Sequence, residues 1–327
     1  MERIKQWRGL AAGLGFLVLI FDSRTALAGA RSGMELCLKT VIPSLFPFFV
    51  LSILMTDTLA KDNVSRQNGW SKRLGLPAAA EPLLVPAFLG GYPVGAECVG
   101  QLYQIRQLSK ETAEGFLSFC SNAGPSFLFG IVSAFFPDIR MVWALWGIHI
   151  VGALLTAWTV RLPQAMPSNR PSDISNDRQS VLSKAIRAMV FVCAWIILFR
   201  TGIGFLHKWI LWRLSAPVQV LVTGLLELAN GCTGLASVED LSVRFVLCSC
   251  MLAFGGICVI LQTSSVTAGL SLRYYFQGKL LHTGYSFLLS CAIAGPGKGL
   301  WLVLLVGTVL FLRKLKNRDS ISVPVAV

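Results

Sequence analysis

Polar, glycine-containing stretches interrupt the apolar segments of this chain in both of its halves. They lie at residues 90–95 and 121–126 in the first half and at residues 227–234 and 262–265 in the second. An unpaired backbone group in hydrocarbon costs several kcal/mol, so non-helical chain survives there only if it is buried in protein or lines a cavity. Matching interruptions in two halves are typical of transporters whose substrate binds between inverted repeats. The pattern predicts a carrier with broken helices.

The composition supports a membrane location. Of 327 residues, 54% are hydrophobic and 14% are charged, whereas a soluble protein carries about 25% charged residues. The net charge of +13 comes from cations scattered over short loops, and basic cytoplasmic loops are usual in membrane proteins. We therefore expect a polytopic membrane protein that contacts the lipid bilayer and does not bind nucleic acid.

Catalytic and metal-binding patterns are missing from the sequence. The nine cysteines lie almost all in apolar stretches, where cysteine behaves as a small hydrophobic residue. Cys248 and Cys250 lack the C-x-x-C spacing of redox and metal sites, and the three histidines, His149, His207 and His282, are isolated in the sequence. Hydrolase, P-loop and zinc-protease motifs do not occur. We predict no enzyme activity, no catalytic residue, no metal and no cofactor.

The chain divides where its composition changes. Residues 1–32 contain cations, an apolar run and an Ala-Leu-Ala sequence. This is the pattern of a signal peptide or of a retained anchor, and we favour the anchor. Residues 33–160 then form a first unit, residues 161–184 a polar cytoplasmic linker, residues 185–299 a second unit, and residues 300–327 a last helix with a basic tail.

Loop charge predicts a topology. If the basic linker and tail are cytoplasmic, the basic loops at 61–81 and 103–114 share that side only when residues 83–102 enter the membrane and return. A matching re-entrant hairpin is expected at residues 218–235. The predicted fold is all-α, with about eight transmembrane helices plus two re-entrant hairpins with broken helices. The two units are expected to be inverted, with both termini cytoplasmic. In this topology Lys208 and Arg213 lie on the outer side of the membrane, which goes against the positive-inside rule.

The first interruption has a functional and a structural interpretation. Its glycines and proline break the helical hydrogen bonds, and the free N–H groups of a hairpin tip would bind an anion. The alternative is that small residues only let membrane helices approach closely. The candidate substrate-binding residues here are Gly91, Tyr92, Pro93 and Gly95.

The second interruption surrounds Gly124 and Pro125. An unwound helix of this kind holds substrate or ion in many carriers. The alternative is a proline kink whose polar neighbours bond the freed backbone groups. The candidate residues are Ser121, Asn122 and Ser126.

The second half contains a carboxyl group in an apolar segment. Such a group costs about 2.5–3.5 kcal/mol even on the insertion scale, so Glu227 is a candidate for substrate or proton binding, with Asn230 beside it. The alternative is that Glu227 caps the chain around Asn230 near the membrane interface. The polar stretch at 262–265 is the expected symmetry partner of the Ser-Asn break, or else a loop end between helices. Its candidate residues are Gln262, Thr263 and Ser264.

Several of these motifs resemble a known family. The sequences PSLFPFF at 43–49, GYPVGA at 91–96, SFCSN at 118–122 and AFGG at 253–256 resemble the sporulation integral membrane protein YlbJ (SpoVV) group. The resemblance implies that the two units are nucleoside-recognition (Gate) repeats. It also implies a role in endospore formation, moving dipicolinic acid out of the mother cell. Family hairpins often carry a cation where this chain has Glu97.

We therefore predict a sporulation-associated transporter of dipicolinate or a similar small anion. It would be integral to the cell membrane and, in sporulating cells, to the outer forespore or mother-cell membrane. Two other functions stay open. One is a nucleoside or ion transporter of the Gate-domain type, and the other is a non-transporting membrane scaffold of sporulation.

Overall fold

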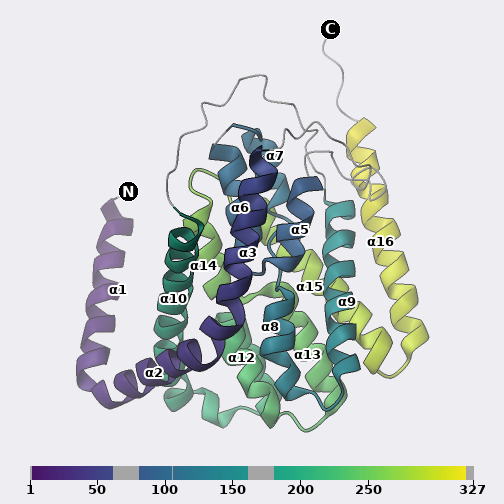
Figure 1. Ribbon diagram of the computed structural model, residues 1–327. Helices are drawn as coiled ribbons and strands as arrows, with labels where there is room; N and C mark the ends of the chain where they lie inside the picture. Colours follow the sequence, from purple (N-terminus) through teal and green to yellow (C-terminus); the bar gives the residue numbers. More distant parts are fainter. Residues whose placement is uncertain (1, 62–80, 105, 161–179, 322–327) are drawn as a thin grey trace.

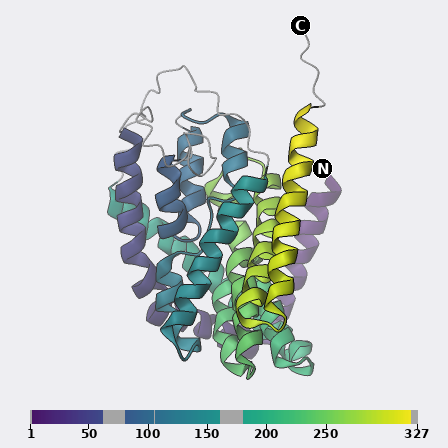
Figure 2. The ribbon, with the colours of Figure 1, turned by 90° about the vertical axis from the view of Figure 1, so that its right-hand side faces the viewer.

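The computed structural model describes residues 2–61, 81–104, 106–160 and 180–321, and every regular element in these ranges is a helix. Most helices run roughly along one axis (Figures 1 and 2). Four of the described segments are long and apolar enough to cross a membrane: Ser23–Leu51, Ile139–Thr159, Val181–Trp209 and Leu241–Val266. Large apolar side chains such as Leu198, Phe287 and Val303 are exposed, as expected of helices that face lipid. The chain is an all-α membrane protein, as predicted.

The N-terminal helices approach the bundle from one side. α1 (Glu2–Phe21) stands apart, α2 (Ser23–Leu36) crosses the lower end, and a π-helical turn (Cys37–Val41) leads into the ascending α3 (Ile42–Lys61) (Figure 1). The Asp22 carboxylate accepts a hydrogen bond of 3.3 Å from the Thr25 N–H and caps α2. The pKa of Asp22 lies below the usual aspartate value because the Lys208 ammonium donates a hydrogen bond to its carboxylate.

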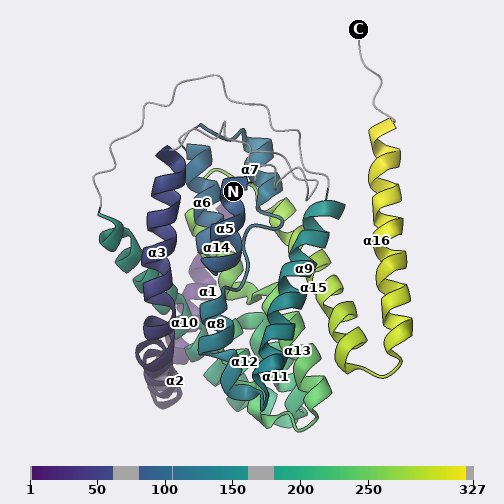
Figure 3. The same cartoon turned by 45° about the vertical axis from the view of Figure 1, so that its right-hand side comes forward.

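The first half continues with an antiparallel helix pair and an interrupted helix. Its elements are α5 (Glu81–Leu89), α6 (Val94–Gln104), α7 (Lys110–Phe116), α8 (Pro125–Gly130), a 3-10 turn (Val132–Phe135) and α9 (Ile139–Thr159). α5 descends from the upper end of the bundle and α6 returns to it (Figures 1 and 3). α7 and α8 descend with a non-helical segment between them, and α9 ascends.

The second half has the same kinds of elements in the opposite directions. They are α10 (Val181–Trp209), α11 (Ala216–Leu226), α12 (Leu228–Gly234), α13 (Leu241–Phe254), α14 (Gly256–Val266), α15 (Arg273–Ala294) and α16 (Lys298–Ile321), with 3-10 turns at Leu211–Arg213 and Leu235–Ser237. α10 descends, α11 and α12 form a pair in the lower half, and α13 and α14 ascend (Figures 1 and 3). α15 then descends and α16 ascends beside it at the edge of the bundle (Figure 2).

Three of the four predicted interruptions lie near their expected positions, and the fourth does not. The chain is non-helical between α5 and α6, before Pro125, and at Glu227, whereas residues 262–265 belong to α14. The break of that helix lies instead at Gly255 and Gly256, with φ of 82° and 88°, a backbone conformation that glycine adopts without strain. The polar side chains at the end of α14 suit a continuous helix, because Ser265 donates a hydrogen bond of 2.9 Å to the carbonyl one turn earlier.

Several predicted boundaries also shift. The basic loop at 61–81 and the linker at 161–184 lie mostly outside the described residues, but α10 begins at Val181, inside the predicted linker. α16 begins at Lys298, within the predicted second unit, and continues to Ile321, through most of the predicted basic tail. In a sequence, charged residues at a helix end resemble those of a loop. A cation at the upper end of α16 instead lies over an aromatic ring, with the Arg313 guanidinium 4.2 Å from the centre of the Trp158 ring.

Close backbone contacts hold the interrupted helices in the bundle. A Cβ added to Gly95 of α6 would lie 1.7 Å from the carbonyl oxygen of Cys120, and one added to Gly278 of α15 would lie 2.0 Å from the carbonyl oxygen of Ser118. Small residues at such contacts are typical of membrane helix packing. The non-helical segment before α8 is therefore enclosed by α6 and α15.

We expect Gly278→Ala to lower the free energy of unfolding by about 1–3 kcal/mol, because the Ser118 backbone cannot move aside. Gly284→Ala on the same helix is the control, since a Cβ there meets nothing within 4 Å. It should be neutral or stabilise by up to about 1 kcal/mol through helix propensity. Thermal unfolding in detergent measures both variants, and equal midpoints would contradict the close contact.

Candidate functional site

Three cavities lie in a row along one face of α10. The upper cavity, about 320 Å³, touches α10 at Lys184, Arg187, Ala188 and Phe191. The central cavity, about 40 Å³, touches it at Val192 and Ile196. The lower cavity, about 470 Å³, touches it at Arg200, Ile203, Gly204 and His207. This spacing of three and four residues is that of one helix face, so α10 forms a common wall of all three cavities.

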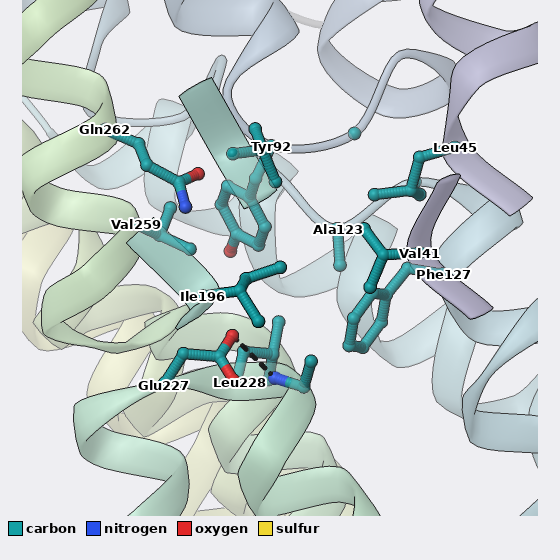
Figure 4. A pocket seen from close by; sticks show the side chains of 14 residues that line it. Val41, Leu45, Tyr92, Ala123, Phe127, Ile196, Glu227, Leu228, Val259 and Gln262 are labelled. Atoms are coloured by element: carbon teal, nitrogen blue, oxygen red, sulfur yellow. Dashed lines mark hydrogen bonds between the residues drawn. The ribbon is translucent and has the colours of Figure 1, made fainter. Parts of the chain in front are cut away.

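The central cavity lies where the interrupted helices of both halves meet. Tyr92 and Gln262 enter it from above and Glu227 from below, with Ile196 between them (Figure 4). A buried water needs about 10–15 Å³ on a comparable measure, so a cavity of about 40 Å³ holds a few waters and no ring-sized solute. The described structure is therefore closed at its centre.

Tyr92 joins the helix pair of the first half to the broken helix of the second. Its hydroxyl donates a hydrogen bond of 2.9 Å to the carbonyl oxygen of Leu252, which lies in the last turn of α13. The ring also packs on the break itself, because a Cβ on Gly255 would lie 3.1 Å from it. The last carbonyls of a helix have no partner within the helix, and Tyr92 supplies one from the other half of the chain.

Lys279 of α15 is a buried basic residue at the same junction, and the sequence interpretation missed it. Its side chain is 2% exposed, and its ammonium donates to the Tyr92 hydroxyl at 2.8 Å and to the carbonyl oxygen of Ser121. The ammonium also lies 4.5 Å from the centre of the Tyr92 ring and 5.5 Å from that of Tyr275. A lysine next to an apolar segment was the available signal in the sequence.

The histidines are not all isolated, as their sequence positions suggested. His149 of α9 and His282 of α15 stack with ring centroids 4.6 Å apart. His149 Nε2 accepts a hydrogen bond of 3.0 Å from the Ala123 N–H, and His282 Nε2 lies 2.9 Å from the His149 carbonyl oxygen. The pair therefore supports the non-helical segment before α8. Distant histidines meet here because α9 and α15 pack side by side.

Glycine contacts let the broken segments meet without side chains between them. In the first half, a Cβ on Gly124 would lie 2.9 Å from the Cα of Gly91, whose φ is 78°. In the second half, a Cβ on Gly231 would lie 2.3 Å from the Cα of Gly224. The turn between α5 and α6 thus approaches the segment before α8, and α11 approaches α12, backbone to backbone, as small residues allow in membranes.

Glu227 is held by the helix that follows it. Its carboxylate oxygens accept hydrogen bonds from the N–H groups of Ala229 at 3.0 Å and Asn230 at 2.7 Å. This is the capping role named as an alternative for Glu227, but the residue is 3% exposed and also lines the central cavity. The Asn230 side chain in turn accepts a hydrogen bond from Arg200 Nη1.

The predicted site residues fall into two groups. Gly91, Tyr92, Glu227 and Gln262 line the central cavity, Pro93 the upper cavity and Asn230 the lower cavity. The others do not line these cavities: Gly95, Ser121, Asn122, Ser126, Thr263 and Ser264. Asn122 serves the backbone, donating to the carbonyls of Ala87 at 3.2 Å and Phe119 at 2.7 Å, and Ser264 is exposed.

Fold and site together define an all-α membrane protein whose interrupted helices meet at an internal cavity. The chain is similar to the sporulation integral membrane protein YlbJ of Bacillus subtilis (strain 168), with 22% identity over 316 residues, covering 82% of this chain and 77% of that protein. This similarity supports the resemblance to the YlbJ sporulation integral membrane proteins that the motifs indicated. Neither a protein-family model nor a solved structure matches the chain.

Tyr92→Phe should lower the free energy of unfolding by about 1–3 kcal/mol, because it removes a hydroxyl and leaves the Leu252 carbonyl without that donor. The matched control is Tyr274→Phe on α15, whose hydroxyl makes no hydrogen bond within the described part of the chain, and which should change little. Thermal unfolding compares the two. A Tyr92→Phe midpoint equal to that of the control would show that the bridge between the halves contributes nothing to stability.

Proposed function

We propose that this protein is a sporulation-associated carrier of a small anion, with dipicolinate as the first candidate. It works by alternating access between two inverted Gate-type repeats, in a membrane that separates the mother cell from the forespore. Its termini are cytoplasmic. An interior-negative potential favours exit of an anion by about 2.3 kcal/mol per charge per 100 mV, so export needs no coupled ion.

The order of the helices supports the inverted repeats. A long helix, an antiparallel pair and an interrupted helix occur as α3, α5–α6 and α7–α8, and again as α10, α11–α12 and α13–α14. The first pair lies in the upper half of the bundle and the second pair in the lower half (Figure 3). Such opposed, interrupted segments are the usual pointer to a substrate site midway through the membrane.

The observation that carries the proposal is the meeting of both sets of broken helices at one closed cavity. Larger cavities lie above and below it, at about 320 and 470 Å³, and Val192, Ile196 and Tyr92 narrow the path between them. A carrier needs two vestibules that are not open to each other at the same time. Rocking of one repeat against the other would widen each vestibule in turn.

The charges near this path suit an anion better than a cation. The Arg200 guanidinium is partly buried below the central cavity, and the basic side chain of Lys279 is buried beside Tyr92. Glu227 is the one carboxylate among the described residues that line the central cavity. Glu227 is also engaged by backbone N–H groups, which reduces its repulsion of an approaching anion. Glu97 lies farther up, on the upper cavity with Lys184 and Arg187.

The test is release of pyridine-2,6-dicarboxylate from vesicles that contain the purified chain. We expect saturable release from wild-type vesicles, and release at the level of protein-free vesicles for Ile196→Trp, because the larger ring fills the central cavity. Leu198→Trp, on the same helix and 61% exposed, is the matched control and should transport normally.

Thermal unfolding of Ile196→Trp shows whether a loss of transport comes from a blocked cavity or from a misfolded protein. The control is needed because overpacking can lower the free energy of unfolding by about 1–3 kcal/mol. A folded wild-type protein that moves no dicarboxylate would overturn the substrate assignment. If nucleosides and simple inorganic ions also fail to move, the scaffold function takes its place.

A further inference from the structure

The lower cavity contains donors that are arranged for a ligand. It is about 470 Å³ and lies between α2, α10, α11 and α12. Its polar lining consists of Ser32, Arg200, His207, Gln219, Thr223, Asn230, Thr233 and Ser237, and the described residues that line it include no aspartate or glutamate. A polar, acid-free cavity with one fixed guanidinium favours an anionic occupant.

Arg200 is held in place with part of its donor capacity unused. Its Nε donates to the Ser32 hydroxyl at 3.1 Å and its Nη1 to the Asn230 side-chain oxygen. A guanidinium has five N–H donors in a planar fork. Within the described chain the remaining N–H groups of Arg200 have no acceptor, although the side chain is partly buried. Two anchors fix its orientation and leave the other donors for a ligand.

Asn230 adds a second, independent sign of a missing acceptor. It is 2% exposed, and its side-chain nitrogen Nδ2 is buried with no hydrogen-bond partner. Its oxygen accepts from Arg200, so the amide orientation is fixed by that bond. Buried polar groups are nearly always paired, and the unpaired amide donor here lies directly beside the guanidinium.

We propose that Arg200 and Asn230 form a carboxylate-binding site in the lower cavity. A planar carboxylate matches the guanidinium fork and can accept a further bond from an amide N–H. The nearby Glu227 carboxylate interacts electrostatically with Arg200 and with the Asn230 side chain. Its hydrogen bonds of 3.0 and 2.7 Å come from the backbone N–H groups of Ala229 and Asn230, so it does not occupy the guanidinium fork of Arg200. The inference rests on the proposed carrier function, which makes the cavity a vestibule, and it assigns that carrier a carboxylate site separate from the central cavity.

Isothermal titration of the purified full-length chain in detergent tests the site without requiring transport. The probes are pyridine-2,6-dicarboxylate, benzoate and the neutral benzamide. We expect the carboxylates to bind and benzamide not to bind, and Arg200→Gln to weaken carboxylate binding by about ten- to a hundredfold. Arg213→Gln is the matched control, because Arg213 is exposed at the same end of the bundle and stacks on Trp212 at 5.0 Å.

Each outcome decides the proposal. Equal affinities of wild type and Arg200→Gln, or equal weakening by Arg213→Gln, would overturn the site. If Arg200→Gln does not fold, Arg200→Lys keeps the charge and should reduce the preference for carboxylate over benzamide, and an unchanged preference would also overturn it. Binding that depends on Arg200 without vesicle transport would reject the carrier and keep the site. Transport by Arg200→Gln with the half-saturation concentration of the wild type would keep the carrier and reject the carboxylate site.

Discussion

Backbone hydrogen bonding inside the membrane is the constraint on which the rest of this structure depends. Where a helix stops in the interior, its terminal carbonyl and N–H groups lose their partners, and hydrocarbon offers no water to replace them. Here side chains take that role. Tyr92 donates to the Leu252 carbonyl, Asn122 donates to the Ala87 carbonyl, and Glu227 accepts from the start of α12. The interruptions are stable because each is paired.

The Tyr92–Leu252 bond joins the two halves of the chain, and Lys279 adds two further bonds between them. Tyr92 and Ser121 belong to the first half, and both contact Lys279 in the second. Gly255 lies against the Tyr92 ring. A movement of one broken helix would therefore change the hydrogen bonds of the other. The proposed carrier would require such coupling, because the cavities on its two sides would have to open in turn.

The hydrogen bonds between the two halves lie beside the narrowest of the three cavities. A small central cavity separates two larger ones along α10, so the path is narrowest where the hydrogen bonds between the halves are concentrated. Partly buried Arg200 lies below the constriction, and Lys184 and Arg187 line the cavity above it. An anion would meet a cation on each side of the narrow region, and the closed centre would keep the two sides apart.

The sequence by itself determined the all-α membrane class, the relation to YlbJ and the positions of three helix interruptions. These follow from local chemistry, because glycine, proline and polar residues within apolar runs act on the backbone next to them. The break at Gly255 was misplaced because hydroxyl side chains near residue 264 can either end a helix or bond back to it. Tertiary structure alone decided that Lys279 meets Tyr92, that His149 meets His282, and that α10 borders three cavities. Those contacts join residues more than a hundred positions apart, and their partners are set by how the helices pack.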